Sequence, residues 1–261
     1  MDFNKPEHYQ SCNVHISASP KELARNAANF FLQVINKTAE GQKQVLVALS
    51  GGSTPYPVYK LLANPPYREQ IPWEKLHFFW TDERMVPVNH DENNYHQANI
   101  HLLSLVPLQK DNIHRIKSEL PAHQAAKDYA SQLSNFASPG KTLPAFDFIF
   151  LGLGEDGHTA SLFPRKDQAE EMEQPVIAVS GNYQGRPAGR VTLTPTLINE
   201  ARQICFLVNG SGKAEAVENA IQGIFDPLQH PAQRIKPHDG AVDWMLDQAA
   251  ASRLTRSTNG E

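Results

Sequence analysis

Short apolar runs alternate along the chain with segments in which apolar residues recur at helical spacing. The runs at 45–49, 76–80 and 146–151 are rich in aromatic and aliphatic residues and are bounded by polar or glycine-rich stretches, which is typical of buried strands. The same patterns predict further strands at 176–179, 191–194 and 204–208, and helices at 23–35, 58–62, 93–103, 122–133 and 214–221. This alternation predicts an α/β fold with a mostly parallel sheet and helices on both faces.

The length of 261 residues fits one large α/β domain or two small ones. No repeat or low-complexity linker divides the sequence, so we expect a single domain over residues 1–261. Hydrophobic residues make up 40% and charged residues 20%, which is ordinary for a globular protein. The tail from about residue 252 is polar, and we expect it to be frayed.

The charge and the apolar runs exclude several functional classes. A net charge of -4 provides no basic field for nucleic acid. No stretch approaches the roughly 18 apolar residues of a membrane span, and the polar start at 1–7 has no apolar core of a secretory signal. Cys12 and Cys205 fit no metal or redox spacing, so we expect buried, inert thiols. We therefore expect a soluble cytoplasmic protein without a membrane or nucleic-acid partner.

Four predicted strands, ending at Leu49, Trp80, Leu151 and Val208, each lead into a loop of small or charged residues. In an open parallel sheet the carboxyl ends of strands share one edge, where ligands bind. The third loop runs Gly-Leu-Gly-Glu-Asp-Gly-His and ends at His158. Because it places an imidazole two residues after the carboxylate of Asp156, it predicts a site of proton transfer.

Other interpretations of the third loop are weaker. Its glycines match the dinucleotide-binding pattern, which requires a helix after the loop and an acid at the end of a second strand about 20 residues on. The acids there, Glu170, Glu171 and Glu173, lie in a polar stretch before the next predicted strand. No His-x-His, His-Glu-x-x-His or Gly-x-Ser-x-Gly pattern occurs, so neither a zinc site nor a serine hydrolase is indicated. We expect no cofactor and no metal, although Asp156 with His158 could hold an adventitious ion.

The first loop consists of Ser50, Gly51, Gly52, Ser53 and Thr54, followed by a proline and a predicted helix. Its glycines allow close backbone approach, and hydroxyls beside a helix start suit a phosphate. The lysine of a nucleotide P-loop is absent, and an ordinary capped turn is an equally good interpretation.

The second and fourth loops supply charge. Arg84 could grip a phosphate or an oxyanion, and Asp82 or Glu83 could hold a sugar hydroxyl or orient Arg84. A solvated turn with a surface ion pair is the commoner fate of such a run. Lys213 stands at a predicted helix start, where a cation opposes the helix dipole unless an anion lies nearby. Arg190, at the entry to the strand at 191–194, is a weaker candidate.

These motifs together resemble the 6-phosphogluconolactonase family. The matching segments are SGGSTP at 50–55, TDERMVP at 81–87, GLGEDGHTASLFP at 152–164, RVTLT at 190–194 and GSGK at 210–213. The similarity spans roughly residues 15 to 250. It implies a Rossmann-like, doubly wound fold and cofactor-free hydrolysis of 6-phosphoglucono-1,5-lactone in the pentose phosphate pathway. The chain departs from the family pattern at Asn93, where the family usually has Ser, and at 186–188, where it has Arg-Pro-Ala instead of a Lys-Pro-Pro-like run.

The resemblance suggests a role for each candidate. His158 would deprotonate the attacking water, with Asp156 orienting it. Backbone N–H groups at 152–154, with Arg84, would stabilise the oxyanion. The phosphate would lie against residues 51–54, with Lys213, Arg84 and Arg190 neutralising its charge.

Two alternatives stay open. The related glucosamine-6-phosphate deaminases also have an Asp-Gly-His loop, but theirs continues toward an acid, whereas residues 159–164 contain none. A non-catalytic sugar-phosphate sensor would have no need of His158. The expected partner is a small sugar-phosphate lactone, and the sequence indicates no oligomeric state.

Overall fold

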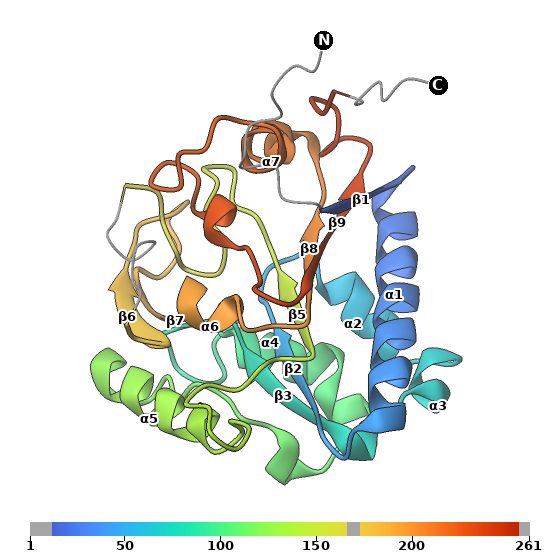
Figure 1. Cartoon of the computed structure of the whole chain (residues 1–261), viewed down its shortest axis with the longest axis vertical. Coiled ribbons are helices and arrows are strands. Elements are labelled where there is room, and N and C mark those ends of the chain that lie inside the picture. The colour runs from blue at the N-terminus through green and yellow to red at the C-terminus, as the bar shows by residue number, and fades with distance from the viewer. Residues whose placement is uncertain (1–11, 166–172, 256–261) are drawn as a thin grey trace.

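The computed structural model describes residues 12–165 and 173–255. The polar start at 1–7, the acids Glu170 and Glu171, and the last six residues of the tail lie outside these ranges. Six strands form a parallel sheet in the order β1-β9-β8-β5-β2-β3 (Figure 1). The strands are β1 (Asn13–Ser17), β9 (Ala241–Asp247), β8 (Gln203–Val208), β5 (Phe148–Leu151), β2 (Val45–Leu49) and β3 (Leu76–Trp80). The predicted parallel sheet is therefore confirmed.

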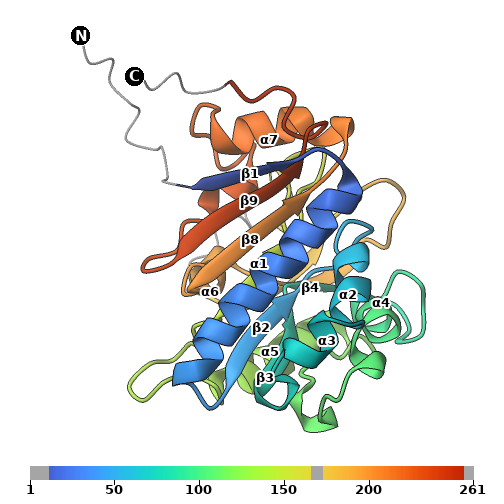
Figure 2. The same ribbon diagram turned by 90° about the vertical axis from the view of Figure 1, so that its right-hand side faces the viewer.

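Helices cover both faces of this sheet, as predicted (Figures 1 and 2). On one face lie α1 (Pro20–Gly41), α2 (Tyr56–Leu62) and α3 (Tyr67–Gln70). On the other face lie α5 (Ala122–Ser134) and α6 (Pro195–Ile198), while α7 (Ala214–Ile221) sits beside β1 and β9. A further helix, α4 (Asn94–His101), packs against α2. One large apolar core joins the sheet to these helices.

The predicted strands at 176–179 and 191–194 do not join the parallel sheet. They form β6 (Val176–Ser180) and β7 (Gly189–Leu193), two strands of a separate antiparallel sheet whose third strand is β4 (Asp82–Arg84). The connection at 181–188 holds no helix, so β6 and β7 pair as a hairpin. The chain leaves β3 through Thr81 and enters β4 directly, which brings the second sheet to the edge where β3 ends.

The strands β1 and β9 were not predicted. β1 is a largely exposed edge strand, and the apolar pattern of β9 is broken by Asp243. That carboxylate is buried where the two strands pair, 2.6 Å from the Nε2 atom of His15 and 2.7 Å from the Nε2 atom of Gln203. Asp243 can be buried because both neighbouring strands supply a hydrogen-bond partner. In the sequence these partners are not visible, so the aspartate interrupts the apolar run and hides the strand.

Three further expectations can be compared with the structure. Cys205 is buried as predicted, Cys12 is only partly buried, and burial raises the pKa of both thiols. The start of the tail is held against α7, because Arg253 pairs with Glu215 and Glu218, so the predicted fraying does not apply to residues 252–255. Within the described ranges, no helix has the length and apolar character needed to cross a membrane.

Candidate active site

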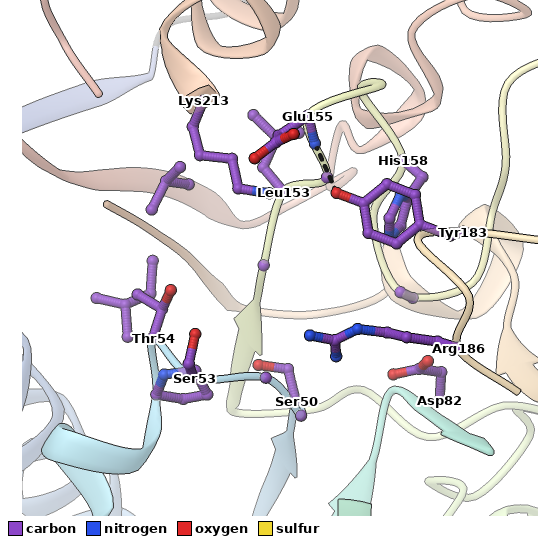
Figure 3. Close-up of a pocket in the computed structure, with 18 of the residues that line it drawn as sticks. Ser50, Ser53, Thr54, Asp82, Leu153, Glu155, His158, Tyr183, Arg186 and Lys213 are labelled. Atoms are coloured by element: carbon purple, nitrogen blue, oxygen red, sulfur yellow. Dashed lines mark hydrogen bonds between the residues drawn. The ribbon is translucent and has the colours of Figure 1, made fainter. Parts of the chain in front are cut away.

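A pocket of about 270 Å³ opens at the carboxyl ends of β2, β5 and β8 (Figure 3). The second sheet and the connection at 181–188 complete its wall. Of the candidate site residues predicted from the sequence, all but Asp156 and Glu83 line this pocket. The lining candidates are Ser50, Gly51, Gly52, Ser53, Thr54, Asp82, Arg84, His158, Arg190 and Lys213. The loops that follow β2, β5 and β8, which lie far apart in the sequence, thus meet at one edge of the parallel sheet, as expected for this fold.

Asp156 lies behind the pocket wall, where it holds the histidine. Its Oδ1 atom is 2.6 Å from the Nδ1 atom of His158 and also accepts the backbone N–H of that residue at 3.2 Å. Burial by itself would raise the pKa of the Asp156 carboxyl, but its interactions with His158 outweigh burial and the net pKa is lowered. An ionised carboxylate on Nδ1 fixes the imidazole in one orientation and leaves Nε2 as the free ring nitrogen.

Glycines in the third loop leave room for the side chains of His158 and Asp156. A Cβ atom at Gly154 would lie 2.1 Å from the His158 ring and 2.4 Å from the Asp156 carboxylate, and Gly157 has a φ of 87°. The N–H of Gly154 donates to the carbonyl of His158 at 2.7 Å. This N–H is therefore unavailable to an oxyanion, contrary to the sequence prediction. Residues 152–165 contain no helix, so the loop also lacks the helix start that dinucleotide binding requires.

The charged residues of β4 are buried, so the interpretation as a solvated turn is wrong. Asp82 accepts the hydroxyl of Ser161 at 2.6 Å and lies 3.9 Å from Nη1 of Arg190, a residue of the paired strand β7. Arg84 donates to the carbonyl and the carboxylate of Glu92. Strand pairing thus places two guanidinium groups around one buried carboxylate.

Glu83 points away from the pocket. Its carboxylate accepts the backbone N–H groups of Arg84, Asn94 and Tyr95, the last two at the start of α4. Burial raises the pKa of Glu83 to about 8, while these three donors favour the ionised form. Glu83 thus joins β4 to α4, and of the two carboxylates offered for a sugar hydroxyl only Asp82 lines the pocket.

Both guanidinium groups keep free donors. Among the described residues, Nε of Arg84 and Nη2 of Arg190 are buried without a hydrogen-bond partner. Burial lowers the pKa of the Arg190 guanidinium, and the charge of Asp82 acts in the opposite direction. Because buried donors are normally paired, these two N–H groups suit an anionic or carbonyl oxygen inside the pocket.

The first loop packs tightly against the start of α4, the helix that follows β4. A Cβ atom at Gly51 would lie 1.8 Å from Oδ1 of Asn94, whose Nδ2 donates to the carbonyl of Asp82. Gly52 has a φ of 102°, which favours glycine. The hydroxyl of Thr54 donates to Asn209 at 2.8 Å, so its proton is already used within the protein. Lys213 occupies the N-cap position of α7 without a side-chain capping hydrogen bond, and it lines the pocket as well.

Several lining residues were not predicted as site residues, among them Tyr183, Gln184 and Arg186 on the connection at 181–188. Nη1 of Arg186 lies 3.6 Å from the Glu92 carboxylate that also pairs with Arg84. The sequence indicated this segment only through the partial match of 186–188 to a Lys-Pro-Pro-like run in the family pattern. Asn93 does not line the pocket; its side chain caps α4 by accepting the N–H of His96, a role that serine also fills.

The structure defines an α/β protein with a ligand pocket at the carboxyl edge of a parallel sheet and a histidine–carboxylate pair in its wall. A family model described as glucosamine-6-phosphate isomerases/6-phosphogluconolactonase matches residues 18–244, and the chain belongs to this family.

Relatives and solved structures of this family cover nearly the whole chain. The 6-phosphogluconolactonase of Synechocystis sp. is 42% identical over 84% of this chain and 89% of its own length. The 6-phosphogluconolactonase of Rattus norvegicus is 36% identical over 93% of each chain. The structure of the 6-phosphogluconolactonase from Trypanosoma brucei superposes with a TM-score of 0.83 at 28% identity, over 94% of this chain and 99% of that one.

Proposed function

We propose that this chain hydrolyses 6-phospho-D-glucono-1,5-lactone to 6-phospho-D-gluconate, a step of the pentose phosphate pathway. The relatives named 6-phosphogluconolactonase match it along most of their lengths. The observation that carries the proposal is the bond between His158 and Asp156 in the wall of a pocket that also contains buried guanidinium donors.

The two ends of the pocket suit the two ends of such a substrate. Ser53 and Lys213 lie at one end, while His158 lies at the other (Figure 3). We place the phosphate with the first group, where Gly52 adds backbone flexibility and the lysine adds positive charge. Binding the unreactive phosphate there holds the lactone carbonyl near the imidazole, which is how a remote contact raises the rate.

In the proposed reaction Nε2 of His158 takes a proton from water as its oxygen attacks C1 of the lactone. Asp156 accepts the hydrogen bond from the N–H at Nδ1, so the proton stays on the ring, and its negative charge stabilises the imidazolium that forms. The free donors of Arg190 and Arg84 stabilise the oxyanion. The intermediate collapses with cleavage of the bond between C1 and the ring oxygen, which takes the proton back from the imidazolium. No step of the proposed reaction uses a cofactor.

We further propose that one domain carries the whole reaction, supported by the continuous core beneath both sheets. The location differs among relatives, since one from Arabidopsis thaliana is named chloroplastic. Residence of this chain in the cytoplasm stays a prediction.

The test is the decay of freshly prepared lactone with and without the protein, measured against spontaneous hydrolysis. The proposal expects acceleration proportional to protein concentration. If the decay is unchanged, the proposal is wrong. Release of ammonia from glucosamine 6-phosphate would then identify a deaminase, and binding of 6-phosphogluconate without turnover would identify a sensor.

A further inference from the structure

The imidazole of His158 is held between two aromatic rings. The ring of Tyr183 packs edge-on against it with centroids 4.5 Å apart and planes at 77°. The ring of Phe163 contacts it in a tilted arrangement, with centroids 5.0 Å apart and planes at 43°. Figure 3 shows Tyr183 beside His158 at the mouth of the pocket. The hydrogen bond to Asp156 fixes only Nδ1, so these rings restrict the tilt of the imidazole about that bond.

The aromatic rings belong to a small apolar cluster of their own. Phe163, Ile177 and Val179 are buried together, with Tyr183 packed against them, apart from the main core. Gly181 allows this packing, because a Cβ atom there would lie 2.3 Å from the Phe163 ring. The second sheet therefore supports the histidine through a rigid apolar base.

Tyr183 also fastens the loop that carries the histidine pair. Its hydroxyl accepts the backbone N–H of Glu155 at 3.2 Å, next to Asp156 in the sequence. The neighbouring Gln184 donates to the Glu155 carboxylate at 3.3 Å. One tyrosine thus contacts the imidazole through its ring and the imidazole's loop through its oxygen.

We propose that Tyr183 is a positioning residue that holds His158 in the orientation in which Nε2 faces the attacking water. This inference rests on the proposed lactonase function. The ring supplies most of the effect, since it makes the direct contact with the imidazole. Small displacements of a catalytic group cost as much as about 100-fold in rate.

The experiment compares Tyr183→Phe with Tyr183→Leu in the full chain. The phenylalanine keeps the ring, so kcat stays within about 3-fold of the parent. The leucine removes the ring and lowers kcat by roughly 10- to 100-fold, while KM for the lactone changes less than about 3-fold. Tyr67→Leu, which removes a buried tyrosine on α3 outside the pocket, is the control for a general loss of packing.

A double-variant cycle separates positioning from a merely structural role. If Tyr183 acts through His158, then Tyr183→Leu has little further effect in a His158→Ala chain. An equal loss in both backgrounds would overturn the proposal, as would a Tyr183→Leu enzyme with the parent kcat. Ring ¹⁵N signals of His158 give a second readout, because loss of positioning in Tyr183→Leu changes them while Tyr183→Phe leaves them unchanged. A parent chain that does not accelerate lactone decay would instead refute the proposed function itself.

Discussion

The two sheets contribute to the pocket in different ways. The parallel sheet supplies loops, because β2, β5 and β8 end at the pocket and deliver the glycine-rich turns, His158 and Lys213. The antiparallel sheet supplies side chains from within its strands. Its Asp82 and Arg190 are buried, and both form a hydrogen bond with the hydroxyl of Ser161. The first sheet thus contributes residues that follow its strands, whereas the second contributes charged side chains that are already fixed by their hydrogen bonds.

The largest effect is expected at the loop that carries His158, the proposed general base. Replacing His158 with alanine removes proton transfer, so kcat should fall by about 10²- to 10⁴-fold with little change in substrate binding. Steady-state lactone hydrolysis measures kcat, and titration with 6-phosphogluconate measures binding. His123→Ala, at an exposed position of α5, is the matched control and should retain full activity. A kcat within 10-fold of the parent would remove His158 from the mechanism.

The next effect lies in the antiparallel sheet. Arg190→Lys keeps the positive charge but loses the planar fork and its unpaired Nη2 donor. Loss of charged hydrogen bonds in a buried site should lower kcat/KM by about 10- to 100-fold. Arg202→Lys is the control, because Arg202 also pairs with a buried aspartate, Asp147, but lies outside the pocket. Equal activity of both variants would show that the fixed guanidinium is dispensable.

A third prediction concerns the place where the first loop meets α4. Gly51→Ala should lower the free energy of unfolding by about 1–3 kcal/mol, because the new methyl group collides with Asn94. Urea unfolding measures the change. In an Asn94→Ala background the same substitution should cost much less. Gly41→Ala, where a Cβ atom meets nothing within 4 Å, should be tolerated. A similar cost of Gly51→Ala in both backgrounds would contradict the close contact.

The smallest effect is expected at Lys213, which lines the pocket and is only partly buried. Lys213→Met should raise KM by roughly 3- to 10-fold without changing kcat, and the difference should shrink at high salt because an accessible charge is screened. The difference should also vanish for gluconolactone without a phosphate. Lys236→Met, at an exposed position, is the control. An equal loss with both lactones would place the phosphate elsewhere.

In the parallel sheet, β2, β3, β5 and β8 could be predicted from their local sequence, whereas β1 and β9 could not. The runs at β2, β3, β5 and β8 are apolar apart from His77 and Gln203, because all their other residues are buried, and the small or charged residues after each run mark the pocket edge. The third loop was interpretable because His158 and Asp156 are close in sequence. Their contact was predicted as an orienting role, and the structure brings the two side chains together.

The antiparallel sheet could not be predicted, because its pairing depends on contacts between distant segments. Nothing near Arg190 indicates that Arg84 lies directly across from it, and β4 has no apolar pattern. Tyr183 was missed for the same reason, since its ring becomes a site feature only after β6 and β7 fold over the rim. A buried charge requires hydrogen-bond partners, and those of Asp82 lie in segments distant in the sequence, such as Ser161.

The connection at 181–188 has a consequence for how this pocket can change over evolution. It carries Tyr183, Gln184 and Arg186, yet it is anchored at both ends by one hairpin and forms no part of the parallel sheet. Substitutions at Gln184 and Arg186 alter the pocket lining without disturbing the strands of the parallel sheet. For the proposed lactonase, selection could therefore retune which lactones enter through residues 184 and 186, while the aromatic ring that positions His158 is retained at residue 183.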